Sequence, residues 1–334
     1  MAWNHTKQNQ KGRKSKQKKA AKKVAKKLFG KNLSLVMVLI LLLGVAFWLC
    51  YQQFPPVREF VDSLGIIETT TTRPKVPSVD PEGKLLGVHY IDVGQGDATL
   101  LKTPDGSILI DCSEPEYGDD IIAYLDSQGV TELEYFIITH PDEDHMGSAA
   151  YIIRNITVKK VIMNGQTKNT KFFSNTLDAM EERGVEGEIV SPGDIIELGA
   201  LRLDILGPIS INHSTAEWNN ASIIIHAIYG ETSFLFTGDA EESGEEDLIE
   251  HYRAELDCDV FQAGHHGSST SNSQALLDAA TPTYIVISCG EGNSYGHPHQ
   301  AALDRFEDSG AEIYRTDKEG TIVFTSDGVT ITKN

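Results

Sequence analysis

The stretch Thr139-His140-Pro141-Asp142-Glu143-Asp144-His145-Met146-Gly147 decides how the rest of the chain is interpreted. Two histidines and two aspartates occur in the pattern His-x-Asp-x-Asp-His, directly after the apolar run Tyr135–Ile138. The run predicts a buried strand, and the motif predicts a tight loop at its carboxyl end, where α/β proteins commonly build their sites. Imidazole and carboxylate ligands together suit zinc, manganese or iron. The alternative, a helix start rich in acidic residues, does not account for the two flanking histidines.

Further candidate ligands also follow apolar segments that predict strands. They are Asp111 after residues 108–110, Asp239 after residues 234–238, and His265 with His266 after residues 260–261. A lone aspartate in such a place is commonly a turn or cap residue. The same chemistry at four strand ends instead indicates one shared metal site at the edge of a sheet.

Strand and helix patterns alternate along the chain from residue 86 to residue 326. Strands are expected at 86–93, 98–103, 107–112, 133–139, 158–163, 188–191, 195–198, 201–207, 221–229, 233–237, 260–263, 284–288, 312–316 and 321–326. Helices are expected at 119–128, 146–154, 174–183, 241–251, 273–280 and 300–309. Strand hairpins followed by crossover helices occur twice, which implies two packed mixed sheets with helices outside.

The N-terminal part has a different composition. Residues 1–31 hold twelve of the chain's 29 Lys and Arg and no Asp or Glu. Residues 33–51 are uncharged and almost wholly apolar, about the length that a helix needs to cross a bilayer. We therefore expect a basic cytoplasmic tail at 1–31, a transmembrane helix at 32–54 that contacts the lipid bilayer through residues 33–51, and an extracellular remainder. A cleaved signal peptide is the alternative, but no small-residue cleavage site follows the span.

Residues 55–84 are expected to form a linker, because the stretch 68–84 is rich in Thr and Pro and lacks apolar periodicity. One large domain is expected at 85–334. Beyond residue 31 lie all 48 acidic side chains and only 17 of the 29 basic ones. Such a domain lacks the basic face of non-specific DNA-binding proteins, although residues 159–160 and 168–171 hold local lysine clusters. The four cysteines match no zinc-finger spacing.

Several motifs resemble those of the metallo-β-lactamase-fold hydrolases, and in particular the extracellular hydrolase domain of ComEC-type competence proteins, which take up DNA. The motifs are DVGQGD at 92–97, LIDC at 109–112, THPDEDHMG at 139–147, NNAS at 219–222, FTGD at 236–239, AGHHGS at 263–268, NSYGHP at 293–298 and YRTDKEG at 314–320. The resemblance covers about residues 85–330. It implies that the domain at 85–334 is a hydrolase with an αββα sandwich fold and a two-metal site at one edge of the sheets.

Carried onto this sequence, the resemblance implies two divalent metal ions, zinc or manganese. The implied ligands are His140 and Asp142 for one ion, Asp144 and His145 for the other, and Asp239 as the bridge. One of His265 and His266 would complete the second site, and the sequence does not choose between them. Asp142 stands where the commonest family motif has a second histidine, and this oxygen-rich set shifts the preference from zinc towards manganese.

A further group of residues is expected around the metals: Asp97, Asp111, Asn219, Asn220, Asn293 and His297. Asp111 is expected to orient a ligand, with a turn-forming aspartate as the alternative. Asn219 or Asn220 stands near the usual place of a histidine that this chain lacks, and His213 and His226 are nearby alternatives. His297 is expected to bind phosphate or to protonate the leaving group, while Asp142 or Asp144 accepts a proton from the attacking water.

These features predict a membrane-anchored extracellular phosphodiesterase with two metal ions, and the ComEC likeness implies a nuclease that acts on DNA. One alternative is an esterase for wall or lipid phosphodiesters, such as phosphocholine-bearing teichoic acids. Another is a non-catalytic metal-binding surface protein, which the missing histidine would favour. Hydrolysis of β-lactams fits the changed ligands less well. The sequence indicates no obligate protein partner.

Overall fold

The computed structural model describes residues 85–209 and 218–334. The predicted tail, transmembrane helix and linker at 1–84 lie outside the described residues, as does His213. Within the part of the chain that is described, no helix is both long and apolar enough to cross a membrane.

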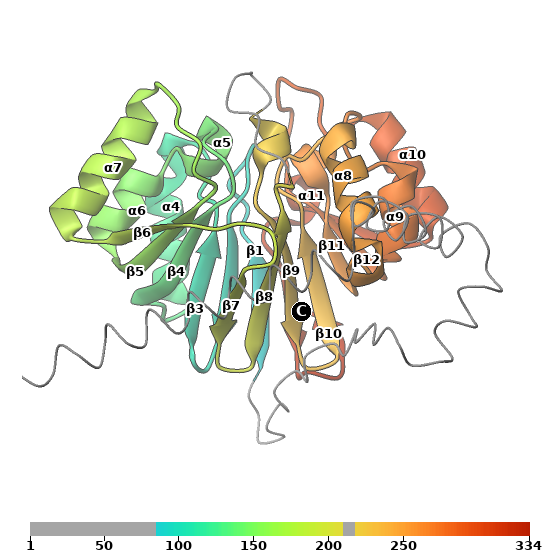
Figure 1. Ribbon diagram of the computed structural model, residues 1–334, viewed down its shortest axis with the longest axis horizontal. Coiled ribbons are helices and arrows are strands. Elements are labelled where there is room, and N and C mark those ends of the chain that lie inside the picture. Colours follow the sequence, from blue (N-terminus) through green and yellow to red (C-terminus); the bar gives the residue numbers. More distant parts are fainter. Residues whose placement is uncertain (1–84, 210–217) are drawn as a thin grey trace, which may run out of the picture. The chain divides into compact units, whose positions relative to one another are not determined.

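Two β-sheets pack face to face, and helices cover the outer face of each sheet (Figure 1). The first sheet has the strand order β15-β14-β1-β2-β3-β4-β5-β6, and the second has the order β13-β12-β11-β10-β9-β8-β7. The first sheet is built from β1 (Leu86–Tyr90), β2 (Thr99–Thr103), β3 (Gly106–Ile110), β4 (Glu132–Ile138), β5 (Thr157–Met163), β6 (Glu186–Ile189), β14 (Ile322–Ser326) and β15 (Ile331–Lys333). The second is built from β7 (Ile195–Leu198), β8 (Leu201–Gly207), β9 (Ile224–Tyr229), β10 (Thr232–Phe236), β11 (Val260–Gln262), β12 (Tyr284–Ile287) and β13 (Glu312–Arg315). The predicted αββα sandwich is confirmed.

The helices fall into two groups. The first sheet is covered by α4 (Gly118–Ser127), α6 (Ala149–Asn155) and α7 (Lys171–Arg183), and the second by α8 (Glu242–Tyr252), α9 (Gln274–Ala280) and α10 (Gln300–Ser309) (Figure 1). Two one-turn helices, α5 (Glu143–Met146) and α11 (Thr316–Glu319), lie in loops. The six predicted helices are therefore all present among the described residues, with ends that differ by up to a few residues from the prediction.

Successive side chains of a strand point to opposite faces of its sheet, so the strands contribute apolar residues both to the core between the sheets and to the cores beneath the helices. In β3, Ile108 and Ile110 pack in the core between the sheets, whereas Leu109 packs against the helices of its own side. A third core joins the second sheet to α8, α9 and α10. Burial on both faces explains why these strands are continuous apolar runs rather than alternating ones.

Three sequence predictions need correction. The strand expected at 221–229 begins only at Ile224, because Asn219–Ala221 form a 3₁₀ turn. The helix expected to begin at Met146 is divided, since Met146 ends α5 and a new helix begins at Ala149. The sequence also gave no indication of β15, a short strand at the edge of the first sheet.

The parallel strands bring several loops to one edge of the sandwich. In the first sheet β3, β4 and β5 run parallel, and in the second β10, β11 and β12 do the same. The loops that follow β3, β4, β10 and β11 carry the predicted ligands, and the loop that follows β12 carries His297. This edge, the upper one in Figure 1, is where the site forms.

His89 of β1 gives a test of the packing between the first sheet and α4. Its Nδ1 lies 2.8 Å from the Tyr124 hydroxyl, and burial, followed by the nearby Lys102, lowers the pKa of His89 from 6.5 to about 4. The folded state therefore binds fewer protons than the unfolded chain below pH 6.5. The stability from the neutral ring is complete above pH 6.5 and is lost as the pH falls towards 4.

Between pH 7 and pH 4 the wild type should lose about 3 kcal/mol of its free energy of unfolding through His89. We expect His89→Gln to remove this loss. The measurement is urea unfolding of the full chain at pH 7 and pH 4, with a chelator present so that metal release does not contribute. The free energy of unfolding should fall less in the variant than in the wild type. An identical fall in both proteins would show that the buried ring does not contribute.

Candidate metal centre

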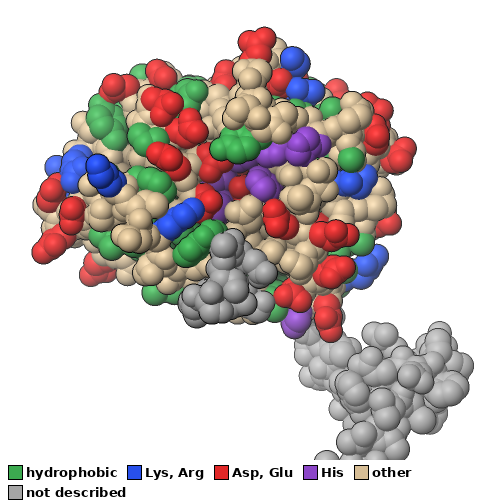
Figure 2. All heavy atoms as spheres, turned by 90° about the horizontal axis from the view of Figure 1, so that it is seen from above, with side chains coloured by type: hydrophobic (Ala, Val, Ile, Leu, Met, Phe, Trp, Pro, Cys, Tyr) green, Lys and Arg blue, Asp and Glu red, His purple; other side chains and the backbone are tan. Residues whose placement is uncertain are grey.

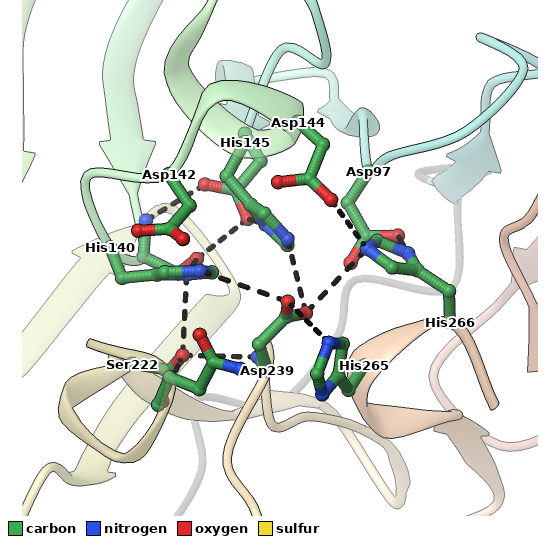
Figure 3. A network of polar contacts seen from close by, with 12 residues as sticks. Asp97, His140, Asp142, Asp144, His145, Ser222, Asp239, His265 and His266 are labelled. Atoms are coloured by element: carbon green, nitrogen blue, oxygen red, sulfur yellow. Dashed lines mark hydrogen bonds and ion pairs between the residues drawn. The ribbon is translucent and has the colours of Figure 1, made fainter. Parts of the chain in front are cut away.

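Asp239 lies at the centre of the site, directly beyond the end of β10 (Figure 3). Its Oδ1 lies 3.0 Å from Nε2 of His145 and 3.8 Å from Nε2 of His266. Its Oδ2 lies 3.8 Å from Nε2 of His140 and 3.6 Å from Nε2 of His265. The two oxygens of one carboxylate thus face two different pairs of histidines.

Four residues at this centre are close enough together to hold a cation. Asp144, His145, Asp239 and His266 each offer a ligand atom, and these atoms all lie within 4.8 Å of one another. His266 belongs to this group because its Nε2 is also 3.2 Å from Oδ2 of Asp144. His265 instead faces the other oxygen of Asp239, together with His140. The geometry thus places His266, rather than His265, on the side of Asp144 and His145.

The side chains at this centre fit a metal ion. Nε2 of His140 is buried and makes no hydrogen bond, and Nε2 of His145 and Oδ1 of Asp239 are buried, 3.0 Å apart, without other hydrogen-bond partners. Buried polar atoms of native proteins nearly always have a partner, so a convergent set of this kind suits a bound cation. Nitrogen and carboxylate oxygen are the donors that zinc and manganese accept.

The opposite ring nitrogen, Nδ1, is held by hydrogen bonds in His140, His145 and His266. Nδ1 of His145 lies 2.8 Å from Oδ2 of Asp111, which is itself fixed by the Thr139 backbone N–H and hydroxyl. Nδ1 of His140 contacts the hydroxyls of Thr139 and Ser222 at 3.1 and 3.3 Å. Such contacts fix the ring orientation and leave Nε2 as the ligand atom.

His266 follows the same rule, since its Nδ1 lies 3.2 Å from the Ser288 carbonyl oxygen and 3.5 Å from Oδ1 of Asp97. His265 does not, because its Nδ1 has no hydrogen-bond partner and lies 3.6 Å from Oε1 of Glu241. All four rings direct Nε2 towards Asp239. Asp97 and Asp111 contact the Nδ1 side of His266 and His145, respectively.

The adjacent histidines reach different oxygens because both have left-handed backbone conformations. The φ angles are 50° at His265 and 54° at His266, in the turn Gly264–Gly267. Each such non-glycine residue costs about 1–3 kcal/mol, so the surrounding structure must hold it. Asn272 does so: its Oδ1 accepts from the Gly264 N–H at 2.8 Å, and its Nδ2 donates to the Gly264 carbonyl at 2.9 Å.

Residues of helices α8 and α10 hold the loop that contains Asn272. The buried Glu245 of α8 accepts hydrogen bonds from the backbone N–H groups of Asn272 and Ser273. Arg305 of α10 donates to the carbonyls of Ser271 and Asn272 at 2.7 and 2.6 Å. The histidine turn is therefore fixed from both sides by residues that carry no motif in the sequence.

The charges of the centre are strongly coupled. Burial disfavours a charged ring, but the carboxylates of Asp239 and Asp111 raise the pKa of His145 well above its usual value. Burial also disfavours a charged carboxylate, yet His145 and His266 hold the pKa of Asp239 well below its usual value. The pKa of Asp144 is lowered in the same way by His266 and His145. The charged forms of these carboxylates and imidazoles therefore stabilise one another.

A cavity of about 120 Å³ opens beside this centre and is visible as a hollow lined with histidine on the face shown in Figure 2. Its lining consists of Gln95, Asp142, Asp144, Asn219, Asp239, His265, His266, Tyr295 and His297. Burial, followed by the nearby His266 and His265, lowers the pKa of His297 to about 4. Its Nδ1 is buried without a hydrogen-bond partner.

Three predicted residues have other contacts. Asp142 lies at the cavity, but its Oδ1 is paired with Nζ of Lys168 at 2.6 Å. Asn220 is not among the lining residues, since its Oδ1 accepts from the N–H groups of Glu241 and Gly244 at the start of α8. Asn293 holds its own loop through hydrogen bonds with the His297 N–H and carbonyl.

Several residues of the site were not predicted from the sequence. Glu241 and Ser222 contact ligand histidines, and Tyr295 lines the cavity. Lys168 belongs to the lysine cluster at 168–171, and the sequence predicted no contact between it and the site. Ser222 and Tyr295 lie within motifs that resemble the family, whereas Glu241 follows Asp239 by two residues with no distinguishing pattern.

Comparisons with known proteins agree with this geometry. Residues 91–291 match the family model of the Metallo-beta-lactamase superfamily. The chain is 31% identical over 266 residues to ComE operon protein 3 of Bacillus subtilis, covering 74% of this chain and 34% of that protein. It is 29% identical over 254 residues to Competence protein ComA of Neisseria gonorrhoeae, covering 74% and 33%. The resemblance to competence proteins is confirmed, and the chain spans about a third of the length of these relatives.

Among solved structures, the chain is similar to the metallo-beta-lactamase fold protein YhfI from Bacillus subtilis, with a TM-score of 0.49 and 12% identity. That similarity covers 72% of this chain and 100% of the other.

Asp111→Asn tests whether the residue behind His145 controls metal binding. An amide nitrogen facing Nδ1 of His145 donates a hydrogen bond, so the ring proton moves to Nε2 and blocks the ligand atom. We expect metal affinity to fall about 10–100-fold, measured by competition with a chromophoric chelator. Asp119→Asn, which changes an exposed carboxylate of α4, should keep the wild-type affinity. Equal affinities for both variants would remove Asp111 from the site.

Proposed function

The chain belongs to the metallo-beta-lactamase superfamily, and we propose that it is a two-metal phosphodiesterase, specifically a nuclease that acts on DNA. The observation that carries the proposal is the position of Asp239, whose two oxygens face separate histidine pairs. A carboxylate placed in this way suits a bridge between two divalent ions. Paired ions are a common solution for phosphodiester hydrolysis.

The two proposed metal sites share Asp239. Asp144, His145 and His266 would hold one ion, and these are the residues of the compact group. His140, with Asp142 beside it, would hold the other, and His265 faces the same oxygen of Asp239. When bound, such ions polarise a phosphoryl group and make water a better nucleophile near neutral pH.

The cavity residues have separate roles in the proposed reaction. Asp142 and Asp144 both line the cavity, so a carboxylate oxygen that is not committed to metal accepts the proton of the attacking water. His297 lines the same cavity with an unpartnered Nδ1, which suits a hydrogen bond to the phosphate or to the leaving oxygen. The burial of the surrounding side chains strengthens each of these interactions.

DNA is proposed as the substrate because ComA of Neisseria gonorrhoeae, a relative of this chain, is named a competence protein. The uncharged stretch at 33–51 and the basic residues before it support a domain that is anchored in the membrane and faces outwards. In that position the enzyme would meet DNA outside the cell.

A second candidate is an esterase for wall or lipid phosphodiesters that carry a cationic group such as choline. The observation in its favour is the charge of the cavity, whose lining includes three aspartates and neither Lys nor Arg. A cationic headgroup would be attracted to such a lining.

The test uses the purified full chain, stripped of metal and then supplied with manganese or zinc. We expect metal-dependent cleavage of DNA that the chelator abolishes. Asp239→Asn should lower the rate about a hundredfold or more, because it removes the charge of the bridge and keeps its shape. The matched control is Asp327→Asn, which changes an exposed aspartate in a turn that is not part of the site.

Glycerophosphocholine is the parallel substrate in the same assay. Cleavage of it without cleavage of DNA would favour the second candidate. Metal binding without cleavage of any phosphodiester would leave a non-catalytic metal-binding protein.

A further inference from the structure

Tyr295 is a large aromatic side chain that remains exposed at the cavity. Its side chain is 60% exposed, whereas the large aromatic residues of the cores are almost fully buried. Among the exposed large hydrophobic side chains of the described residues, Tyr295 is the one that lines the metal cavity. Single exposed aromatic residues are common on protein surfaces, so it is the position of Tyr295 at the cavity that indicates a role.

The ring of Tyr295 is held in a fixed orientation. It stacks on the ring of His297 with a centroid separation of 5.6 Å and an interplanar angle of 20°. His297 is buried and contacts His299 in an edge-on arrangement at 4.8 Å. Oδ1 of Asn293 accepts hydrogen bonds from the N–H groups of Tyr295 and His297 at 3.2 and 3.0 Å. An aromatic ring ordered in advance loses little entropy when it binds a partner.

The cavity is too small for a whole nucleotide. Pockets that enclose drug-sized ligands have volumes of about 300–1,000 Å³, whereas this one has about 120 Å³. The space beside Asp239 can therefore accept the reacting phosphate group while the attached groups stay outside. Tyr295 forms part of the wall past which those groups must extend.

We propose that Tyr295 is a stacking platform for the nucleobase next to the scissile phosphate, and that the substrate is single-stranded DNA. The proposal rests on the proposed nuclease function and specifies its substrate. Base-to-aromatic stacking is independent of sequence because every base has a π face. In a duplex those faces are stacked on neighbouring base pairs, so an unpaired strand is the form that reaches the ring.

The charges near Tyr295 favour stacking over attraction of the phosphate backbone. Asp144 is the main cause of a raised pKa at the Tyr295 hydroxyl, and Glu114 and Glu143 contribute after burial. A polyanion gains nothing from these carboxylates, and bound metal ions offset only those that act as ligands. An uncharged contact to the base therefore supplies affinity at a cavity whose lining contains neither Lys nor Arg.

The test compares Tyr295→Ala and Tyr295→Phe in the full-chain, metal-loaded protein. The substrates are a labelled single-stranded oligonucleotide and the same oligonucleotide with abasic residues. For Tyr295→Ala we expect KM on the base-bearing strand to rise about tenfold with little change in kcat. KM on the abasic strand should change less than twofold, and Tyr295→Phe should resemble the wild type on both. Tyr151→Ala, which removes an exposed tyrosine from α6, is the control and should behave as the wild type.

An equal rise of KM on both strands would overturn the proposal, because the ring would then act on the backbone. If Tyr295→Ala instead raised KM for glycerophosphocholine and left KM for the oligonucleotide unchanged, the ring would be assigned to a choline headgroup.

A binding measurement separates this proposal from the nuclease function. If the wild type cleaves no DNA, the nuclease function fails. Fluorescence anisotropy with the same labelled strands still decides the role of the ring. Tyr295→Ala must then weaken binding of the base-bearing strand about tenfold and leave the abasic strand unchanged. Equal binding of both strands by wild type and variant would overturn the stacking role as well.

Discussion

The buried carboxylate of Asp239 is the constraint on which the rest of the site depends. It is 3% exposed, and Nε2 atoms of four histidines face it at 3.0–3.8 Å. A carboxylate removed from water is stable only when positive charge or hydrogen bonds compensate. Asp239 and His145 stabilise one another's charged forms, so the pKa of His145 is raised while that of Asp239 is lowered. Divalent ions would supply the same charge, so protons and metal compete for the same atoms.

The fold meets this constraint by combining a rigid sandwich with strained loops. The strands end at one edge, and beyond them Asp111, His265 and His266 have left-handed backbone conformations with φ between 50° and 57°. Each conformation is unfavourable by itself and persists because surrounding contacts hold it. Thr139 and His145 contact Asp111, while Asn272, Glu245 and Arg305 hold the histidine turn. The precision of the site therefore depends on residues well outside its motifs.

The sequence predicts the parts of this arrangement that local patterns control. The apolar runs predicted the strands. Because the carboxyl ends of parallel strands lie at the same edge of a sheet, the polar residues that follow these strands were expected to lie close together, and they do. The assignment between His265 and His266 could not be predicted, since it depends on two consecutive backbone angles. The contacts of Asn220 could not be predicted either, because its partners lie on α8, more than twenty residues away in the chain. Residues that act through long-range backbone contacts, such as Glu245, have no local pattern at all.

The acidic charge of the domain has a consequence for any phosphodiester substrate. A polyanion approaching a surface rich in carboxylates is repelled at long range, and salt screens that repulsion over about 8 Å at physiological ionic strength. Within that distance, metal ions held by residues of the Asp239 centre would supply positive charge beside a cavity lined by Asp142, Asp144 and Asp239. On the proposed function, this attraction would act mainly on the reacting phosphate group. Contacts that do not depend on charge would then contribute to binding the rest of a DNA chain, and the exposed ring of Tyr295, stacked on His297, is of that kind.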